Sequence, residues 1–329
     1  MLKAGVIGMG RWGQRLVNSV QRDGNPLGDQ LKFVAGTTRT RQKIESFAQS
    51  QKLVMFDSVD AMLHGGNLDA VVIASPHSQH EAHVRAAVAA GLHVFVEKPL
   101  ALEGATAQEM VSLCDEAGVL LAVGFNRRFR GAYRAMLELA QSGKLGKLLH
   151  VEGNFSGPFG FGYTADAWHA QPDETPAGGL TLMGVHVLDC MIGLMGPVAS
   201  VTARSKRQAL EVSLDDTTDA SLEFHSGATG YLSTLTATNA NWRLQVFGTK
   251  GWAQMIDQNQ LIVSNEAGVQ TQPFPDADAE RAELEAFAAA AAGSKRPYPV
   301  PNGEVVNGIK TLTAITRSVK ERGQPVSVD

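Results

Sequence analysis

Near its N-terminus the chain carries three glycines with the spacing GxGxxG, directly after a short apolar run. The apolar run, Lys3–Ile7, predicts a buried strand, and the next residues predict a helix over Trp12–Gln21. At such a turn the first glycine permits a tight bend, the second lets backbone approach a pyrophosphate, and the third lets helix and strand pack closely. The helix N-terminus offers N–H groups to phosphate oxygens, so we predict a dinucleotide site, with a purely structural turn as the alternative. The residues of this predicted site are Gly8, Met9, Gly10, Arg11, Trp12 and Gly13.

The residues after the second predicted strand indicate which dinucleotide fits. An NAD site usually places Asp or Glu at this point, where the carboxylate accepts hydrogen bonds from the ribose 2′-hydroxyl. Here the predicted strand Leu31–Thr37 is followed by Thr38 and Arg39, without a carboxylate. Arginine binds a phosphate through charge-assisted, bidentate hydrogen bonds, which suits a ribose 2′-phosphate. The sequence therefore favours NADP over NAD; a solvated helix start with Thr40 as N-cap is the alternative.

These residues need a frame that brings several strand ends together, and the first 124 residues have the pattern of one. Short apolar runs, continuous as in strands buried on both faces, alternate with helical patterns. Further strands are expected at Asp69–Ser75, Leu92–Val96 and Val119–Val123, and helices at Arg41–Gln51, His80–Ala90 and Ala105–Ala117. Repeated β–α–β units predict an α/β fold, with a Rossmann doubly wound parallel sheet over residues 1–124.

The pattern changes after Gly124, and we expect a second domain over residues 125–329 for substrate binding and oligomerisation. Strand-and-turn patterns with antiparallel alternation run from Val198 to about Val269, with hairpin turns near Gly227 and Gly251. Gly- and Pro-rich loops are expected over 153–179. Helices are expected at Arg128–Ser142, Val185–Leu194, Ala277–Ala292 and Glu304–Arg322, and the last of them can pack back on the first domain.

Composition excludes several classes of function. Of 329 residues only two are cysteines, Cys114 and Cys190, which indicates no disulfide framework and is typical of the cytoplasm. A net charge of −4 disfavours nucleic acid as a partner. The apolar runs are too short for a membrane span, and the N-terminus lacks a signal-peptide layout. No cysteine, histidine and carboxylate spacing indicates zinc, so we expect no metal.

Motifs along nearly the whole chain resemble one family. They are Ala74–His80, Gly91–Leu100 with its Glu-Lys-Pro, Val123–Phe129, Gly178–His186, Val246–Gly251 and Gly323–Val326. The chain thereby resembles the glucose–fructose oxidoreductase, inositol dehydrogenase and rhizopine-catabolism (Gfo/Idh/MocA) family. The resemblance implies an N-terminal Rossmann domain and a C-terminal α/β domain with a large, mostly antiparallel open sheet. That sheet is expected to cover the nicotinamide and to form the interface of a homodimer or homotetramer.

The resemblance also implies two catalytic residues, Lys98 and His186. Lys98 would hydrogen-bond the reacting oxygen and stabilise negative charge there, and His186 would exchange its proton. A solvated strand-end lysine and a buried core histidine are the alternatives. The family pattern also allows a cis peptide before Pro99, which would make Glu97–Lys98–Pro99 a fixed corner.

One position departs from the family pattern. The family has an aspartate four residues before the histidine, and this chain has Leu182 there. A leucine cannot accept a proton or stabilise a protonated imidazole, so His186 lacks the carboxylate that the family pattern supplies. Asp189 matches a further family aspartate. Leu182 therefore indicates a changed substrate, a mechanism centred on Lys98, or a site that has lost activity.

Further residues are assigned from the same motifs. The cofactor would also contact Ser75, Pro76, His80, Glu97 and Lys98. The substrate would contact Asn126, Arg127, Trp168 and Asp189. Packing at the domain junction is the alternative for Asn126 and Arg127, and a surface-loop aromatic is the alternative for Trp168. The aromatic residues of the same region that could stack on a ring substrate, or only pack the loop, are Phe155, Phe159, Phe161 and Tyr163.

Together these features predict an NADP-dependent oxidoreductase, a dehydrogenase or reductase. It would transfer a hydride between nicotinamide and the hydroxyl or carbonyl carbon of a small polar substrate, by family likeness a sugar, polyol or cyclitol. Two alternatives stay open. One is a dinucleotide-binding regulator or partner subunit without turnover, which Leu182 motivates. The other is a lyase or glycosidase that retains its dinucleotide.

Overall fold

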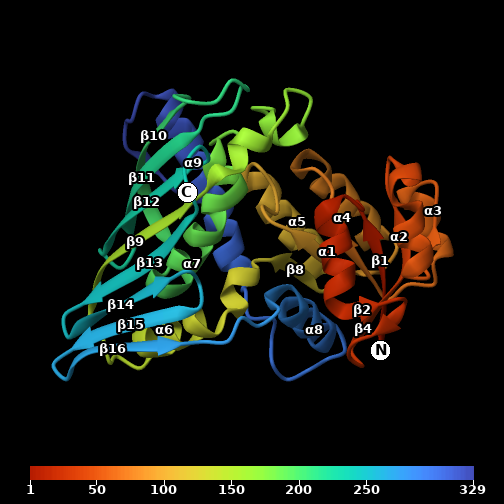
Figure 1. Ribbon diagram of the computed structural model, residues 1–329, viewed down its shortest axis with the longest axis horizontal. Coiled ribbons are helices and arrows are strands. Elements are labelled where there is room, and N and C mark those ends of the chain that lie inside the picture. The colour runs from red at the N-terminus through yellow and green to blue at the C-terminus, as the bar shows by residue number, and fades with distance from the viewer. The chain divides into compact units, whose positions relative to one another are not determined.

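The computed structural model describes all 329 residues, which fall into two compact units. The first unit comprises Met1–Ala101, Thr106–Asn126 and Asp278–Asn302. The second comprises Leu102–Ala105, Arg127–Ala277 and Gly303–Asp329. None of the helices is both long and apolar enough to cross a membrane. Figure 1 labels the elements used below.

The first unit contains a six-stranded sheet in the order β5-β4-β1-β6-β7-β8, with every neighbouring pair parallel. Its strands are β1 Leu2–Ile7, β4 Leu31–Thr37, β5 Val54–Met55, β6 Ala70–Ile73, β7 His93–Glu97 and β8 Leu121–Gly124. Its helices are α1 Arg11–Val20, α2 Glu45–Ser50, α3 Val59–Gly65, α4 His80–Ala89, α5 Gly104–Ala117 and α8 Ala279–Ala291, and a short hairpin joins β2 Gln21–Arg22 to β3 Asn25–Pro26. The predicted α/β class and parallel Rossmann sheet are confirmed.

The boundary of the first unit differs from the prediction. Residues 278–302 belong to the first unit, whereas 125–329 was predicted as one domain. Helix α8 joins the sheet because its apolar face is buried: the Phe287 ring lies 5.7 Å from the Phe95 ring of β7. Behind it, the Tyr298 hydroxyl donates to the Val123 carbonyl at 3.0 Å. It is thus the penultimate helix that completes the parallel sheet, and the terminal helix stays in the second unit.

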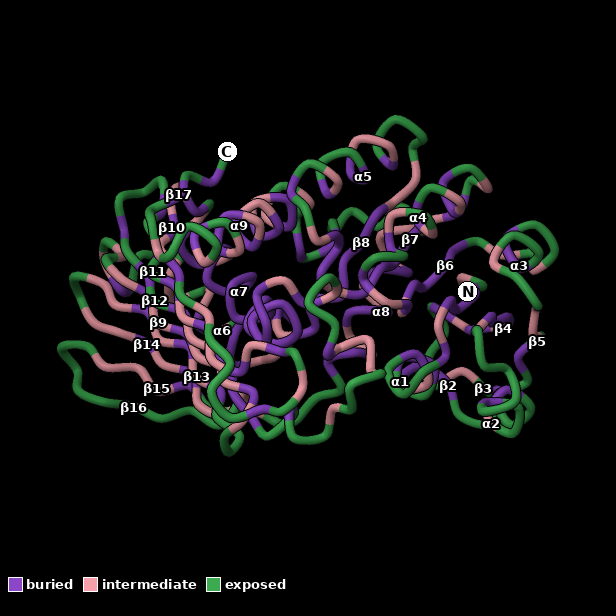
Figure 2. The backbone as a smooth tube through the Cα atoms, turned by 90° about the horizontal axis from the view of Figure 1, so that it is seen from above, coloured by how far each residue is buried: buried purple, intermediate pink, exposed green.

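The second unit contains a nine-stranded sheet in the order β16-β15-β14-β13-β9-β12-β11-β10-β17. Only the β9–β12 pair is parallel, which confirms a mostly antiparallel sheet. The strands are β9 Leu148–Ser156, β10 Val198–Lys206, β11 Thr217–Phe224, β12 Thr229–Leu235, β13 Asn241–Gly248, β14 Gly251–Ile256, β15 Gln260–Asn265, β16 Gly268–Pro273 and β17 Val326–Ser327. Helices α6 Gly131–Gln141, α7 Val185–Met195 and α9 Asn302–Lys320 lie on one face of this sheet (Figures 1 and 2).

Strand β9 in the middle of this sheet was not predicted, because the glycines near it resemble a loop. Gly153 lies within the strand and is needed there: a Cβ at this position would be 2.3 Å from Cγ1 of Val187 on α7. Helix α7 is mostly apolar and almost wholly buried against the sheet, and Figure 2 shows its burial. The predicted helix Arg128–Ser142 also differs, since a 3₁₀ turn at Asn126–Phe129 precedes α6.

A buried ion cluster ties α7 to the neighbouring segments of the second unit. The Arg128 guanidinium donates to both carboxylate oxygens of Asp189, at 2.7 and 2.9 Å, and to Glu304 at 2.7 Å. Arg128 and Asp189 are each about 4% exposed, so water screens this pair little. Burial raises the pKa of Asp189, and the adjacent guanidinium opposes that shift. The cluster therefore holds its charges by mutual neutralisation.

Replacing Arg128 tests this cluster. Arg128→Met would leave the Asp189 carboxylate buried without its partner, and we expect the free energy of unfolding to fall by about 3–5 kcal/mol in urea titrations. The control is Arg204→Met, which breaks an exposed pair with Asp219 and should cost less than about 1 kcal/mol. Equal losses in the two variants would contradict the assignment.

Candidate functional site

The glycine loop after β1 has the shape that a pyrophosphate requires. Gly8 has a φ of +92°, and a Cβ there would lie 2.5 Å from the Ala74 carbonyl oxygen. A Cβ at Gly13 would lie 2.0 Å from the Gly8 carbonyl oxygen. By contrast, a Cβ at Gly10 would meet nothing within 4 Å, and Gly10 caps α1 without a side-chain hydrogen bond. The loop thus leaves open space before the N–H groups of a helix N-terminus, which fits a dinucleotide phosphate.

The other residues of the loop differ in what they present. Arg11 and Trp12 are exposed, whereas Met9 is fully buried. The Met9 sulfur lies 2.6 Å from where a Cβ of Gly36 would stand, so this side chain packs beneath the loop. Of Met9, the backbone is therefore the part available to a ligand.

Two exposed arginines, Arg39 and Arg41, follow the end of β4. Thr38 is half-buried and Arg39 is exposed, without a carboxylate beside it. Arg41 is engaged in an ion pair with Asp57 at 2.8 Å. Arg39 is therefore the arginine that a ribose phosphate can recruit at least cost.

The corner after β7 brings Glu97 and Lys98 to the carboxyl edge of the parallel sheet. The Lys98–Pro99 peptide is cis, in agreement with the expectation from the sequence. Glu97 is buried and accepts a hydrogen bond from the Trp12 side chain of the glycine loop. A Cβ at Gly124 would lie 2.9 Å from a Glu97 carboxylate oxygen, so the glycine that ends β8 makes room for this carboxyl. The glycine loop, the end of β7 and the end of β8 thus meet at Glu97.

Glu97 holds its proton unusually tightly. Burial raises the pKa of Glu97 to about 7, although Lys98 and the Trp12 hydrogen bond favour the charged form. The negative charge of Glu280 adds to the increase. Near neutral pH this carboxyl therefore changes charge beside the candidate catalytic lysine.

The buried His80 ring lies between two carbonyl groups of this corner. Its ring is fully buried, with Nδ1 3.0 Å from the Pro99 carbonyl oxygen and Nε2 3.0 Å from the Ser75 carbonyl oxygen. Burial lowers the pKa of His80 to about 4, so the neutral ring donates to one of these two carbonyls. His80 therefore links the ends of β6 and β7, while its contact with a cofactor stays a prediction. The Ser75 hydroxyl lies 3.0 Å from Nδ1 of His83, and Pro76 is half-buried.

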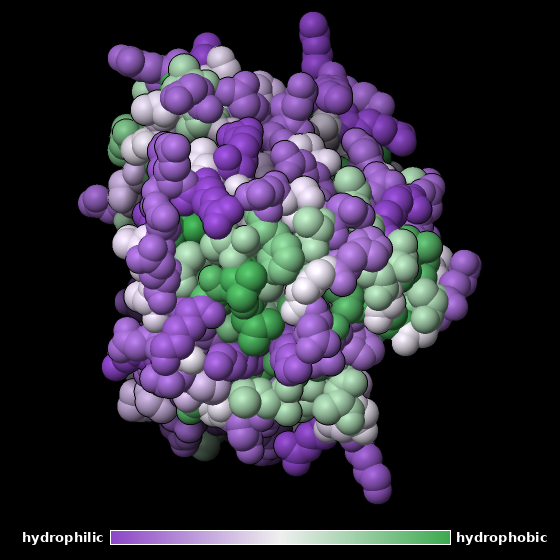
Figure 3. Space-filling view, turned by 90° about the vertical axis from the view of Figure 1, so that its right-hand side faces the viewer, coloured by the Kyte–Doolittle hydropathy of each residue, from purple (hydrophilic) through white to green (hydrophobic).

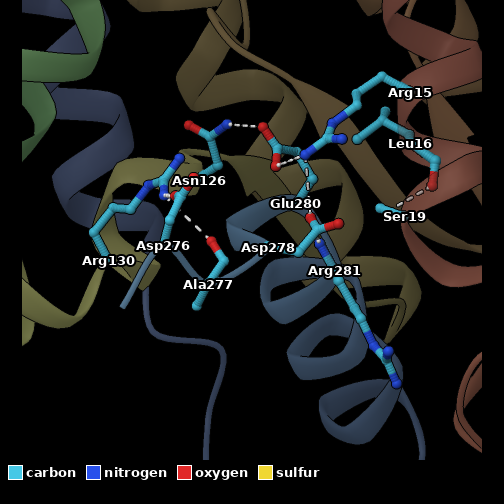
Figure 4. Close-up of polar contacts among 10 residues, drawn as sticks. All are labelled: Arg15, Leu16, Ser19, Asn126, Arg130, Asp276, Ala277, Asp278, Glu280 and Arg281. Atoms are coloured by element: carbon cyan, nitrogen blue, oxygen red, sulfur yellow. Dashed lines mark hydrogen bonds and ion pairs between the residues drawn. The ribbon is translucent and has the colours of Figure 1, made fainter. Parts of the chain in front are cut away.

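Asn126 and Arg15 both contact Glu280 at the start of α8 (Figure 4). The Asn126 amide donates to one Glu280 carboxylate oxygen and the Arg15 guanidinium to the other, each at 3.0 Å. Asp278 caps α8 by accepting from the Arg281 N–H. Asn126 thus bonds within the first unit, and its predicted substrate contact stays a prediction. Sequence reasoning missed Glu280 and Arg15; the only local signal was Asp278 before a helix with glutamate in its first turn.

The second unit carries His186 just after an irregular turn. Residues Leu180–Gly184 form a π-helical turn that leads into α7, and such turns frequently accompany functional sites. A Cβ at Gly184 would lie 2.3 Å from Oγ1 of Thr234, so glycine is needed where the turn meets β12. His186 is 5% exposed, and its ring lies 6.2 Å from the Phe155 ring.

Aromatic and apolar side chains surround this part of the second unit. Leu182 packs in a cluster with Phe155, Tyr163 and Trp168. The Trp168 ring also stacks on His169, with centroids 3.8 Å apart. The Arg127 guanidinium lies 5.6 Å from the Phe155 ring centre. The structure therefore brings three of the predicted residues, Arg127, Trp168 and His186, to one set of rings.

Asp189 lies apart from these rings in its bonding. Both of its carboxylate oxygens accept from Arg128, as described above. In the structure Asp189 thus stabilises the fold through its ion pair with Arg128, and a substrate contact stays a prediction. No group of three or more His, Cys, Asp or Glu side chains is placed to hold a metal ion.

A separate hollow in the first unit lies away from these residues. Its lining includes Leu2, Gln30 and Asp69, which stand at the amino ends of β1, β4 and β6. The glycine loop follows the carboxyl end of β1, so the hollow belongs to the opposite edge of the sheet.

On the face drawn in Figure 3, apolar surface gathers near the middle among polar side chains.

Comparison with known proteins agrees with this geometry. A family model described as "Oxidoreductase family, NAD-binding Rossmann fold" matches residues 2–125, and one described as "GFO/IDH/MocA C-terminal domain" matches residues 133–254. The protein is an NAD(P)-dependent oxidoreductase. It belongs to the Gfo/Idh/MocA family, as its motifs indicated.

The sequence identity to individual relatives is modest, between 24% and 31% for three of them. The chain is 31% identical over 283 residues to D-xylose 1-dehydrogenase (NADP(+)) 2 of Haloferax volcanii, covering 83% of this chain and 85% of that protein. It is 26% identical over 239 residues to the trans-1,2-dihydrobenzene-1,2-diol dehydrogenase of Mus musculus, covering 71% and 70%. The WlbA dehydrogenase of Bordetella pertussis, solved in complex with NADH and UDP-GlcNAcA, shares the fold with a TM-score of 0.87, 24% identity and 99% and 97% coverage.

The buried carboxyl at the corner gives a pH-dependent prediction. Because the pKa of Glu97 is higher in the folded protein, folding binds a proton, and stability falls as pH rises from about 4.5 to about 7. Glu97→Gln removes this term. We expect the variant to gain on the order of 3 kcal/mol relative to wild type across that range in urea unfolding. Glu116→Gln, at an exposed position, is the control and should follow wild type. Parallel curves for wild type and Glu97→Gln would refute the assignment.

Proposed function

We propose that the protein transfers a hydride between NADP(H) and the hydroxyl or carbonyl carbon of a small substrate of the sugar, polyol or cyclitol class. The observation that carries the proposal is the carboxyl edge of the first sheet. There the open position at Gly10, the exposed Arg39 and the half-buried Lys98 follow the ends of β1, β4 and β7. Ligands of open parallel sheets bind at this edge.

The preference for NADP rests on charge. No carboxylate directly follows β4, and Arg39 can donate two hydrogen bonds to a ribose 2′-phosphate. The relative from Haloferax volcanii is named for NADP(+), and it supports the same choice. Gly8, Gly10 and Gly13 would hold the pyrophosphate.

Oxidation of an alcohol removes a hydride from carbon and a proton from oxygen. In the oxidative direction the carbinol carbon loses its hydrogen with both electrons, the hydroxyl loses a proton, and a carbonyl forms. The bound nicotinamide supplies the hydride acceptor. Lys98 would hydrogen-bond the reacting oxygen and stabilise its developing negative charge, and His186 would take the proton. The names of the relatives, a xylose dehydrogenase and a cyclic diol dehydrogenase, support an alcohol substrate.

Nucleotide binding tests the cofactor assignment. We expect tight binding of NADPH and weak binding of NADH by titration of tryptophan fluorescence, because Trp12 lies in the glycine loop. Arg39→Ala should weaken NADPH binding about 10- to 100-fold and leave NADH binding unchanged. Arg22→Ala removes the same charge from an exposed hairpin of the first unit and is the control. If Arg39→Ala weakens both nucleotides equally, arginine does not read the 2′-phosphate.

Turnover tests the role of Lys98. Lys98→Met should lower kcat about 100- to 1000-fold while NADPH binding persists, because the stabilisation is made mainly in the transition state. The exposed Lys43→Met is the control. A wild-type protein that binds NADPH but oxidises or reduces no alcohol or carbonyl would instead favour the regulator that Leu182 suggested.

A further inference from the structure

The second unit contains an apolar wall beside the candidate catalytic histidine. We use this name for the buried side chains of Leu182, Met183, Leu210 and Leu214 with the half-buried rings of Phe155, Tyr163 and Trp168 packed against them. Because the three rings are only half-buried, they keep surface that a small molecule can contact. Phe159 continues the aromatic surface, edge-on to Phe155 at 6.1 Å and 40% exposed.

The wall is held in place by a carboxylate behind it. Asp216 is buried and accepts hydrogen bonds from the backbone N–H groups of Gln208, Ala209 and Leu210, at 2.7–3.0 Å. Burial alone would raise the pKa of Asp216, but these hydrogen bonds and that of Thr217 lower it, so the carboxylate is charged when folded. The loop that delivers Leu210 is thereby fixed.

Backbone packing closes the wall from the other side. A Cβ at Gly160 would lie 2.4 Å from Cδ1 of Leu210, so the 3₁₀ turn Pro158–Gly162 rests directly on that leucine. The same glycine donates its N–H to the Thr236 carbonyl at 2.8 Å. The apolar wall is thus a packed surface and not the side of a loose loop.

The wall adjoins His186 through two of its members. Phe155 lies 6.2 Å from the His186 ring, and Leu182 precedes His186 by one helical turn. For a substrate whose reacting oxygen meets His186, Phe155 and Leu182 are the wall residues nearest to its neighbouring carbons. The Arg127 guanidinium lies 5.6 Å from the centre of the Phe155 ring.

These contacts discriminate between carbons that carry a hydroxyl and carbons that do not. A hydroxyl pressed against leucine and ring carbons loses its hydrogen bonds to water without replacement, which costs free energy. A C–H edge in the same place gains contact with apolar surface and with aromatic faces. The wall therefore favours binding of a substrate whose ring or chain carries no hydroxyl group next to the reacting carbon.

We propose that the substrate is a cyclic alcohol or ketone with a hydrocarbon edge beside its reacting carbon, and that Leu182 and Phe155 select for that edge. This inference rests on the proposed function, since it names the substrate class of the same site. It narrows the substrate to partly deoxygenated rings and disfavours fully hydroxylated ones.

Two probes with the same ring separate these classes: trans-cyclohexane-1,2-diol, which has a hydrocarbon edge, and myo-inositol, which is hydroxylated at every carbon. Binding of each to the full chain with NADPH is measured by isothermal titration calorimetry. Reduced cofactor cannot oxidise an alcohol, so affinity is read without turnover. The diol should bind at least about ten-fold more tightly than myo-inositol. Equal or tighter binding of myo-inositol, or no binding of either ring, would overturn the proposal.

Variants at Leu182 test which residue makes the selection. Leu182→Asp should reduce the diol-to-inositol affinity ratio about ten-fold, and Leu182→Met, which keeps an apolar side chain, should retain it. If Leu182→Asp fails to fold, Phe155→Leu, which removes the ring but stays apolar, should lower diol affinity several-fold. An unchanged ratio in Leu182→Asp, or an unchanged diol affinity in Phe155→Leu where Leu182→Asp does not fold, would overturn the role of the wall.

Turnover is scored separately, so that the two proposals can fail independently. Reduction of NADP by the diol is followed with wild type. Selective diol binding without NADP reduction would contradict the proposed hydride transfer and leave the wall's preference established. NADP reduction by myo-inositol in preference to the diol would confirm the enzyme and overturn the inference about its substrate.

Discussion

The close approach of backbone at Gly8 is the constraint on which the nucleotide end of the molecule depends. With a φ of +92° and no Cβ, Gly8 lets β1 turn against the Ala74 carbonyl, and Gly13 lets α1 return over the same turn. Only then do the open position at Gly10 and the edge of β7 belong to one surface. A side chain at either glycine would occupy space that backbone already fills.

Once the glycine loop is set, Glu97 and His80 hold the corner. Trp12 of the loop donates to Glu97, and His80 lies between the carbonyls of Ser75 and Pro99. Lys98 is thus placed by neighbours that are buried and hydrogen-bonded, while its own side chain stays half-exposed. Rigid support around a charged group is a general requirement for placing charge at a reacting atom. In the second unit the counterpart is an apolar helix whose one buried charge, Asp189, is neutralised by Arg128.

The extent to which sequence predicted this protein differs from element to element. Periodicity and turn residues predicted β4 at Leu31–Thr37, because those signals are local. Strand β9 was missed, because Gly153 serves a contact with Val187 that lies far along the chain. Helix α8 was predicted as a helix and misassigned to the second domain, because only tertiary contacts such as Phe95 with Phe287 decide where it packs. In the candidate site, Gly8 and Lys98 had sequence motifs, whereas Glu280 and Asp216 act through partners that no motif joins.

The return of residues 278–302 to the first sheet has a consequence for biosynthesis. The parallel sheet is encoded almost entirely within the first 126 residues, yet the helix that covers Phe95 and the tyrosine that bonds Val123 come some 150 residues later. A ribosome therefore releases the nucleotide-binding strands long before the segment that finishes their packing. The nascent sheet must wait, with an apolar face uncovered, while nearly all of the second unit is translated. The order of synthesis thus makes the N-terminal unit the first to begin folding and among the last to be completed.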